Sequence, residues 1–289
     1  MLDADGLRKT YGDVVAVAGS SFEVAGGEVF GLVGPNGAGK TTTLRMLAGL
    51  LEPTAGRATV AGRDASDAAT RADVGWLPEE SPLYEDMTAR SYLAFFADLY
   101  GVPRGVADRR IADTLDRLAL DERDRKLGDC SKGMRRKVAI ARALVNDPDV
   151  LLFDEPASGL DPVTTAAVVE FTAELAAAGK TVVFSAHDLH QVEDVCDRVA
   201  IMRDGDIVAR GTVEGLRERH GHTSYRVVLS VPVDGSTERG GRHVLHVDDV
   251  AAVEDARERA TAAGGEVLDI RSREPDLEDL FLRVVEGEA

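Results

Sequence analysis

The sequence predicts an α/β fold in which short, buried, parallel strands alternate with helices. A glycine-rich segment, residues 34–42, lies between an apolar run at Glu28–Val33 and a helical pattern at Thr42–Leu51. Val150–Glu155 is an apolar run that ends in two acids, and Thr181–Ala186 is a further buried strand. The carboxyl ends of such strands are where α/β proteins hold ligands, so we expect a site at this edge.

The glycine-rich segment fits the phosphate-loop motif G-x-x-x-x-G-K-[ST]. It consists of Gly34, Pro35, Asn36, Gly37, Ala38, Gly39, Lys40 and Thr41, followed by Thr42. Its glycines let the backbone fold closely around phosphates, so that N–H groups and the start of the next helix face negative charge. Lys40 is expected to reach the β- and γ-phosphates, and the Thr41 hydroxyl to ligate Mg²⁺. An ordinary glycine-rich loop is the weaker alternative, because the complete motif stands between a strand and a helix.

Further strands are predicted around this loop, at Leu2–Lys9 and Ser20–Val24 before it and at Gly56–Val60 after it. Tyr11 follows the first of these strands. Taken alone, it is a packed aromatic residue. Its place upstream of a phosphate loop allows a second role, in which the ring stacks on a nucleotide base.

The apolar strand Val74–Leu77 ends at a proline and two carboxylates. Glu79 there is either a solvated loop residue or a ligand at the carboxyl end of a strand. From Asp86 to Asn146 the chain is predicted to be mostly helical. Helical spacing in this region is clearest for Tyr92, Phe95, Phe96 and Leu99. Most of these side chains must form a local core, and any exposed surplus would suit docking to a partner.

Ser131 is expected to cap the helix that follows it, and the basic cluster Arg135–Lys137 is expected to be a solvated face. Asp154 would hold Mg²⁺, while Glu155 would orient and deprotonate an attacking water. His187 ends the next strand at the same edge, either as a structural residue or as a contact to a γ-phosphate.

The turn Ser158–Asp161 is predicted to start a helix that runs through Ala178. His187 and His190 could share a helix face, but no third ligand is evident, so the sequence predicts no metal site there. A hairpin follows at Val199–Arg210.

A domain boundary is predicted at residues 220–223. Beyond it, strands and helices alternate in an order that predicts a small α+β domain without a catalytic constellation. His243 and His246 lie in a strand of this domain, and a spacing of three places them on opposite faces.

Composition limits the function classes. The chain of 289 residues can hold one large domain and a smaller one, and it has no apolar run long enough to span a membrane and no apolar signal segment. We therefore expect a soluble, cytoplasmic chain. Cys130 and Cys196 lack metal-ligand spacing and are expected to be free thiols. The net charge of −17 argues against a nucleic-acid partner.

The acidic surface has two explanations. It is either an adaptation to high internal salt, where counterions screen self-repulsion, or the ordinary composition of an acidic protein from a GC-rich genome. The salt hypothesis predicts that the melting temperature rises with KCl concentration. A protein equally stable in dilute buffer would contradict it.

Together these residues resemble the ATPase subunit of an ATP-binding cassette (ABC) transporter, over roughly residues 1–220. The resemblance implies a phosphate-loop NTPase of ABC type, with an antiparallel β subdomain, a helical subdomain at about residues 86–146 and a small α+β C-terminal domain at residues 221–289. By this resemblance Tyr11 stacks on adenine, residues 34–42 form the Walker A loop, and Glu79 stands at the Q-loop position.

The same resemblance assigns the remaining motifs. Ser131, Lys132, Gly133 and Met134 fall on the family signature, Asp154 and Glu155 on Walker B, Ser158–Asp161 on the D-loop and His187 on the switch histidine. It implies that the cofactors are ATP and Mg²⁺, with the metal near Thr41, Glu79 and Asp154. It also implies that Lys40, Glu155 and His187 act in hydrolysis, and that the signature and Asp161 contact nucleotide.

Two departures from the usual family pattern resemble the ABC-2 export branch, which includes drug and sodium exporters. Glu79 replaces a glutamine, and the signature has Cys-Ser-Lys-Gly-Met instead of Leu-Ser-Gly-Gly-Gln. Residues 275–281 resemble the C-terminal extension of that branch. The implied partners are a second ATPase subunit, in a homodimer closed over two MgATP, and an integral-membrane ABC-2 permease that holds the subunit at the inner face of the membrane.

Three other functions fit the sequence less well. A soluble ABC ATPase of DNA repair would need long coiled-coil or zinc-binding inserts between the Walker motifs, and a translation factor normally carries two cassettes. This chain has neither feature. A phosphate-loop kinase would leave the signature, Ser158–Asp161 and His187 unexplained.

Overall fold

The computed structural model describes residues 1–220, 224–273, 277–279 and 281. The chain divides into two compact units, Met1–Val213 and Glu214–Ala289, which are described separately. Helix α7 (Val213–His220) starts at this division, a few residues before the boundary predicted from the sequence.

The first unit is built on a six-stranded sheet with the order β10-β9-β3-β8-β7-β6. Its strands are β3 (Val29–Val33), β6 (Val74–Leu77), β7 (Val150–Asp154), β8 (Thr181–Ala186), β9 (Arg198–Arg203) and β10 (Asp206–Gly211). All neighbours are parallel except β10, which is antiparallel to β9. Every residue of β3, β7 and β8 is buried, as their apolar sequences predict.

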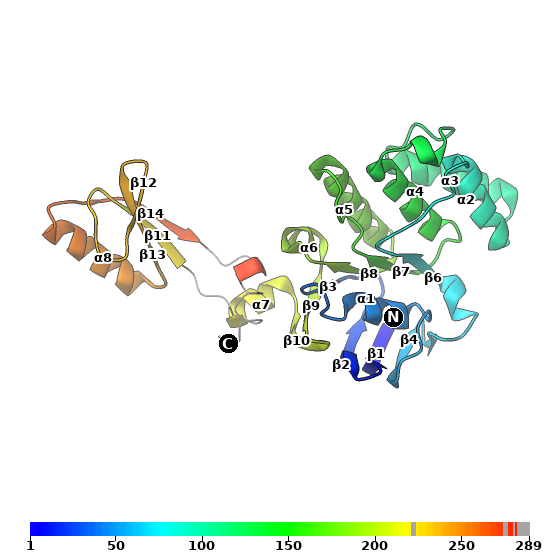
Figure 1. Ribbon diagram of the computed structural model, residues 1–289, viewed down its shortest axis with the longest axis horizontal. Coiled ribbons are helices and arrows are strands. Elements are labelled where there is room, and N and C mark those ends of the chain that lie inside the picture. Colours follow the sequence, from blue (N-terminus) through cyan, green and yellow to red (C-terminus); the bar gives the residue numbers. More distant parts are fainter. Residues whose placement is uncertain (221–223, 274–276, 280, 282–289) are drawn as a thin grey trace. The chain divides into compact units, whose positions relative to one another are not determined.

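The register of this sheet brings three sequence motifs to one edge. Val33 pairs with Ala186, and Asp154 pairs with Ser185. The phosphate loop, the Walker B acids and His187 therefore all follow strands that end side by side. Helix α1 (Lys40–Leu47) covers one face of the sheet, and α5 (Pro162–Ala177) and α6 (Leu189–Val195) cover the other (Figure 1).

A second sheet in this unit is antiparallel, with the order β2-β1-β4-β5. Its strands are β1 (Leu2–Tyr11), β2 (Val14–Val24), β4 (Ala55–Val60) and β5 (Arg63–Asp64). The strand predicted over Ser20–Val24 begins earlier, at Val14, because it pairs with β1 all the way to Tyr11. The buried side chains of this sheet share one core with α1 and the main sheet.

The helical subdomain contains α2 (Ala89–Leu99), α3 (Arg104–Arg117) and α4 (Lys132–Leu144). A capping box between Thr88 and Ser91 starts α2. Tyr92 is buried and packs on Phe96, with ring centroids 4.9 Å apart, whereas Leu99 is 65% exposed. The short 3-10 turns Thr70–Asp73 and Leu127–Asp129 complete the connections.

The second unit contains a four-stranded antiparallel sheet with the order β12-β13-β11-β14. Its elements are β11 (Ser224–Leu229), β12 (Thr237–Arg239), β13 (Arg242–Val247), α8 (Val250–Ala262) and β14 (Val267–Arg273). As predicted, His243 and His246 lie on opposite faces, since they pair with Leu229 and Arg226, which are also an odd number of residues apart. The alternation of elements also predicts a last helix at Asp276–Val285; of this range, residues 277–279 and 281 are helical and the rest lies outside the described residues.

Two expectations from composition can be compared with the structure. In the described ranges, no helix is long and apolar enough to cross a membrane. Cys130 and Cys196 are free cysteines, as predicted. Burial raises the pKa of both thiols, and that of Cys196 most strongly.

Candidate nucleotide-binding site

The phosphate loop holds its own lysine at the edge of the sheet. Lys40 Nζ donates hydrogen bonds to the carbonyls of Gly34 at 2.6 Å and Pro35 at 3.3 Å, and Lys40 is only 6% exposed. Gly39 precedes α1 with a φ of 103°, and a Cβ there would lie 2.6 Å from the Ala16 carbonyl oxygen. Only glycine fits this position, both for its backbone angle and for the close approach.

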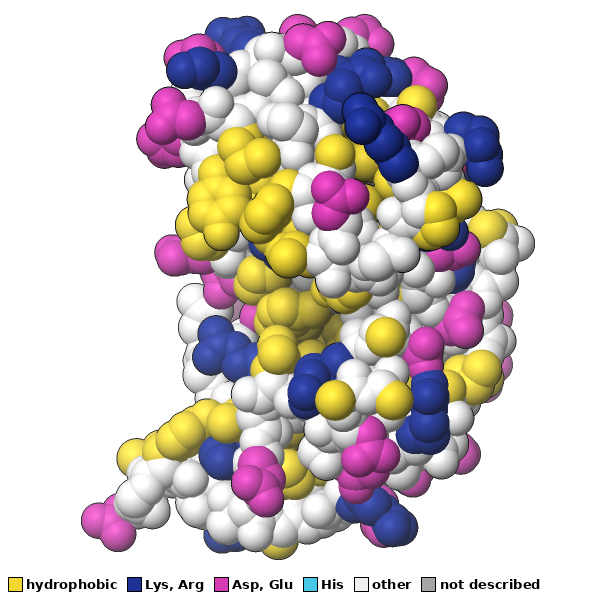
Figure 2. All heavy atoms as spheres, turned by 90° about the vertical axis from the view of Figure 1, so that its right-hand side faces the viewer, with side chains coloured by type: hydrophobic (Ala, Val, Ile, Leu, Met, Phe, Trp, Pro, Cys, Tyr) yellow, Lys and Arg dark blue, Asp and Glu magenta, His cyan; other side chains and the backbone are white. Residues whose placement is uncertain are grey.

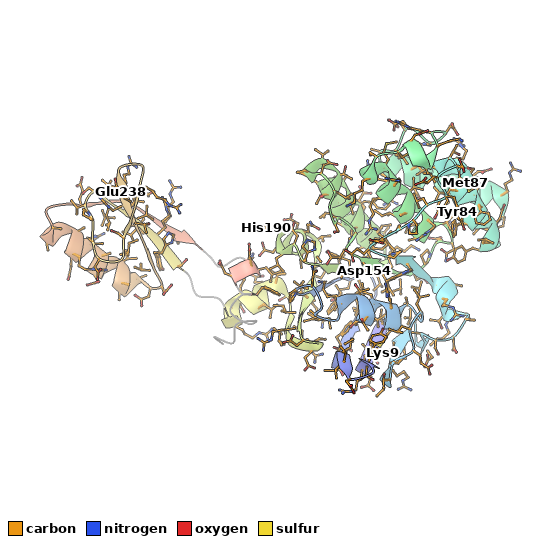
Figure 3. The ribbon with its side chains drawn as sticks, viewed as in Figure 1. Lys9, Tyr84, Met87, Asp154, His190 and Glu238 are labelled. Carbon is orange, nitrogen blue, oxygen red and sulfur yellow. The ribbon has the colours of Figure 1, made fainter. Side chains whose placement is uncertain are left out.

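Two of the three predicted metal ligands, Thr41 and Asp154, meet at the end of β7, where Figure 3 labels Asp154. Thr41 Oγ1 donates to Asp154 Oδ1 at 3.0 Å, and Asp154 is 1% exposed. A hydroxyl and a carboxylate are hard oxygen ligands, and Mg²⁺ usually takes its remaining ligands from water and phosphate. These residues therefore fit a Mg²⁺ bound together with a nucleotide.

The third predicted ligand, Glu79, is not joined to this pair. Its side chain is exposed, and it lines a separate hollow with Lys132 and Ser158. Among the described residues, no hydrogen bond or ion pair links the Glu79 carboxylate to Thr41 or Asp154. The structure thus places Glu79 beside the signature helix.

Glu155 lies between Lys40 and His187. Its Oε1 lies 3.4 Å from Lys40 Nζ, and its Oε2 lies 2.7 Å from His187 Nδ1. The residue is 7% exposed, and its backbone φ of 48° is unusual for any residue other than glycine. A carboxylate fixed between a cation and an imidazole, on a strained backbone, is typical of a functional position.

Ser185 is a site residue that the sequence analysis did not single out. Its hydroxyl donates to Asp154 Oδ1 at 2.7 Å and accepts a hydrogen bond from the Glu155 N–H at 2.9 Å. It is fully buried at the end of β8. The signal for it was a serine that interrupts the apolar run from Val182 to Ala186, two residues before His187.

Replacing Ser185 with alanine is expected to lower the free energy of unfolding by about 1–3 kcal/mol, because the buried Glu155 N–H loses its acceptor. ATP turnover should also fall, since Asp154 and Glu155 lose their shared support. Thr172→Val is the matched control, because the buried Thr172 hydroxyl donates to Val168 O at 2.8 Å within α5, away from the site. Denaturant unfolding and ATPase assays would measure both effects, and equal ATPase losses in the two variants would contradict a role for Ser185 in the site.

The prediction of a solvated Arg135–Lys137 cluster is wrong for Arg136. This side chain is 8% exposed and donates to five backbone carbonyls at 2.7–2.9 Å. The acceptors are Pro78, Glu79, Asp154, Glu155 and Pro156. Burial lowers the pKa of Arg136 to about 10, against the attraction of Asp154 and Glu79, so the guanidinium stays charged at neutral pH.

The predicted signature residues, Ser131 to Met134, lie at the start of α4. The Ser131 side chain accepts a hydrogen bond from Met134 N at 3.2 Å, as the predicted cap. A Cβ on Gly133 would lie 3.1 Å from the Thr164 side chain, so the start of α4 packs closely against the start of α5. In the part of the chain that the structure describes, these contacts lead to α5 and not to the phosphate loop.

The structure also shows the surroundings of Asp161 and Tyr11, the other two predicted nucleotide contacts. The Asp161 carboxylate caps α5, accepting from Val163 N, Thr164 N and the Thr164 hydroxyl. The hydroxyl bond, with the backbone bonds, holds the pKa of Asp161 below its usual value. Tyr11 is 51% exposed at the end of β1, with Lys9 Nζ 5.5 Å from the centre of its ring.

The side chain of Lys132 extends from the signature to the D-loop and lies next to Gly159. Gly159 has a φ of 63°, and Lys132 Nζ occupies the space that a Cβ on Gly159 would fill. Gly159→Ala should therefore displace the lysine and reduce ATP turnover. Gly179→Ala is the matched control, since Gly179 has a φ of 91° with open space around it.

Both glycine variants should lose about 1 kcal/mol of stability through backbone strain, and only Gly159→Ala should change ATPase kinetics. The double variant Gly159→Ala/Lys132→Ala should show a non-additive effect. Additive effects in the ATPase assay would mean that the two residues act separately.

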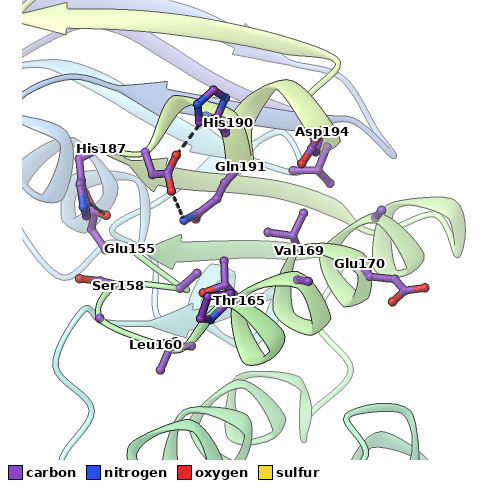
Figure 4. Close-up of a pocket in the computed structure, with 17 residues that line it drawn as sticks. Glu155, Ser158, Leu160, Thr165, Val169, Glu170, His187, His190, Gln191 and Asp194 are labelled. Atoms are coloured by element: carbon purple, nitrogen blue, oxygen red, sulfur yellow. Dashed lines mark hydrogen bonds and ion pairs between the residues drawn. The ribbon is translucent and has the colours of Figure 1, made fainter. Parts of the chain in front are cut away.

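A hollow of about 690 Å³ opens beside the Glu155–His187 pair. The D-loop, α5 and α6 line it, with Glu155, Ser158 and His187 at one end and Glu170 on α5 at the other (Figure 4). In this region Asp188 caps α6 through His190 N at 3.1 Å. His190 belongs to this wall, and no cluster of three potential metal ligands is found among the described residues.

Comparisons with known proteins give a consistent result. Residues 17–158 match the family model described as ABC transporter. The linearmycin resistance ATP-binding protein LnrL of Bacillus subtilis (strain 168) is 34% identical, over 98% of each chain. The Nod factor export ATP-binding protein I of Rhizobium sp. (strain N33) is 35% identical, over 98% of this chain and 96% of its own length.

Solved structures agree. An ATP-binding subunit of an ABC transporter superposes with a TM-score of 0.70 at 32% identity, covering 76% of this chain and 92% of its own. A dimeric ATP-binding cassette in a post-hydrolysis state, with ADP and Pi, has a TM-score of 0.67 at 26% identity, covering 73% of this chain and 98% of its own. From its sequence motifs, its fold and these relatives, the chain belongs to the ATP-binding, ATP-hydrolysing subunits of the ABC transporter family.

Proposed function

We propose that this chain is the ATPase subunit of an ABC-2 type exporter, and that two copies close head-to-tail over two MgATP to drive a separate membrane permease. The main support is that the motifs divide into two groups. Lys40, Thr41, Asp154, Glu155 and His187 converge at one sheet edge, while the signature contacts α5 and the D-loop. A site that needs both groups is completed by a second subunit.

Each residue has a distinct role in the proposed mechanism. Thr41 and Asp154 would hold Mg²⁺, which would supply positive charge to neutralise the phosphates of a bound nucleotide. Glu155 accepts a proton from the attacking water, and His187, 2.7 Å from it, orients the carboxylate. Lys40 stabilises negative charge on the phosphates, and the partner's α4 N-terminus adds N–H groups. Tyr11 supplies an exposed ring for the adenine base.

The permease is proposed to bind the apolar surface of the helical subdomain. Figure 2 shows apolar side chains gathered around a hollow on this face of the first unit. The exposed apolar residues in this region are Phe95, Leu99 and Tyr100 on or next to α2, together with Tyr84 just before the helical subdomain and Leu50 after α1. A groove of about 280 Å³ between Trp76, Phe96 and Arg142 lies in the same region, and the guanidinium of Arg142 lies 5.6 Å from the Phe96 ring centre. Aromatic and arginine side chains are typical of interfaces, so this surface would keep the subunit at the inner face of the membrane.

Purification of the tagged chain from gently solubilised membranes tests this function. A co-purifying membrane protein of roughly six spans would support it. Leu99→Asp should reduce recovery of that protein while ATP binding is kept. Val250→Asp, at an equally exposed position on α8 (59% against 65%), should not. Recovery only with ribosomes or DNA-repair proteins would contradict the exporter and leave the ATPase site unaffected.

A further inference from the structure

The sheet of the second unit has one face covered by α8 and another that α8 leaves open. Val227 pairs with Leu245, and both belong to the core that α8 completes. Arg226 is the next residue along β11, so it lies on the opposite face, together with its partners His246 and Arg271. Among the residues whose side chains the structure describes, the register places five basic ones on this open face: Arg226, Arg239, Arg242, His246 and Arg271.

This face is basic in a chain whose net charge is −17. Within its strands the register adds one acidic residue, Asp269, and Glu266 borders it. Of the five basic residues, Arg226 is half-buried and the others are exposed. The open face is therefore a local concentration of positive charge.

Three of these basic residues form a row. His246, Arg226 and Arg271 are direct neighbours on β13, β11 and β14, which places their Cβ atoms about 4.5–5.5 Å apart. Arg271 Nε lies 2.8 Å from Asp269 Oδ2, whereas the side chains of Arg226 and His246 form no hydrogen bond or ion pair with any described residue. Like charges directly opposite each other disfavour a sheet, so this row would be stabilised by an anionic surface.

We propose that this face binds the phosphate headgroups of an anionic lipid bilayer. Guanidinium groups form paired hydrogen bonds with phosphate oxygens. A protein partner would usually need an exposed apolar or aromatic anchor at the centre of its contact. Here the two central apolar residues, Val228 and Val244, are only 4% and 3% exposed. The accessible side chains of this face are therefore mainly charged ones. Such a surface suits a layer of lipid headgroups better than a protein partner.

The acidic character of the chain does not cancel this attraction. The acids of α8, Glu254, Asp255 and Glu258, lie on the other side of the sheet from this face. Exposed charges separated by more than about 8 Å are largely screened at physiological ionic strength. The open face is therefore expected to attract a bilayer locally, and to orient the second unit toward it.

Cosedimentation of the full chain with vesicles tests the proposal without any permease. The native chain should bind vesicles of phosphatidylglycerol mixed with phosphatidylcholine, and binding should fall as KCl is added. Vesicles of phosphatidylcholine alone should not bind it. Each arginine should contribute about five-fold to binding, so Arg226→Gln/Arg242→Gln should bind roughly 25-fold more weakly.

Arg257→Gln/Arg259→Gln is the matched control, because it removes two arginines from α8 of the same unit, where they pair with Glu254 and Asp255. It should bind within about two-fold of the native chain. The proposal is overturned if the native chain ignores anionic vesicles at low salt, if both variants lose binding equally, or if the open-face variant changes only self-association. ATPase activity, measured on the same samples, tests the cassette separately, so a failure of one proposal is distinguishable from a failure of the other.

Discussion

Glu155→Gln is expected to lower ATP turnover by about 10²–10⁴-fold while ATP binding is retained. Glutamine has the shape of glutamate, so the fold around Lys40 and His187 should persist, but its amide cannot accept a proton from water. We expect hydrolysis to release the two subunits that close over MgATP, so the variant should also accumulate as an ATP-bound dimer.

Three measurements check this result: single-turnover ATPase rates, equilibrium binding of a fluorescent ATP analogue, and gel filtration with MgATP. Glu174→Gln is the control, since Glu174 is an exposed acid on α5 that pairs with Arg117 at 3.0 Å, outside the site. Undiminished turnover in Glu155→Gln would remove Glu155 from the role of base. Loss of ATP binding would show that its charge is needed to hold Lys40.

Arg136→Met is expected to lower the free energy of unfolding by about 3–5 kcal/mol. Methionine fills part of the space of the arginine stem but donates no hydrogen bonds, so five carbonyls lose their donor in a place where little water can replace it. Two of these carbonyls belong to Asp154 and Glu155, so turnover should fall as well.

Denaturant unfolding followed by circular dichroism would measure this loss. The neighbouring Arg135→Met is the control, because the Arg135 side chain is 42% exposed and its Nη1 lies 3.9 Å from Glu85. It should change stability by less than about 1 kcal/mol. Similar losses in the two variants would mean that the guanidinium of Arg136 contributes little beyond its aliphatic stem.

The architecture of the site could be predicted from the sequence because it depends on local sequence patterns. A phosphate loop must follow a strand and begin a helix, and uninterrupted apolar runs predict parallel strands whose ends meet. The convergence of Lys40, Asp154, Glu155 and His187 at one edge follows from these patterns. Their roles, like the domain functions, stay predictions until variants are assayed.

The parts that the sequence did not predict depend on tertiary contacts. Periodicity gives α4 an apolar stripe, but it does not reveal that Arg136 faces the carbonyl ends of two strands. Ser185 is recognisable only once β8 is placed beside β7. The position of Glu79 is set by the loop after β6, whose carbonyls Arg136 binds, and local sequence carries no signal for that contact.

Arg136 also has a mechanical consequence. It stands on the same helix as the signature, little more than one turn from Ser131, and it fastens the loops after β6 and β7 to that helix. A displacement of the signature is thereby expected to reach the backbone on both sides of Glu155 through this single side chain. A shift of α4 is therefore expected to move the Glu155 carboxylate as well, so the two positions cannot be adjusted independently.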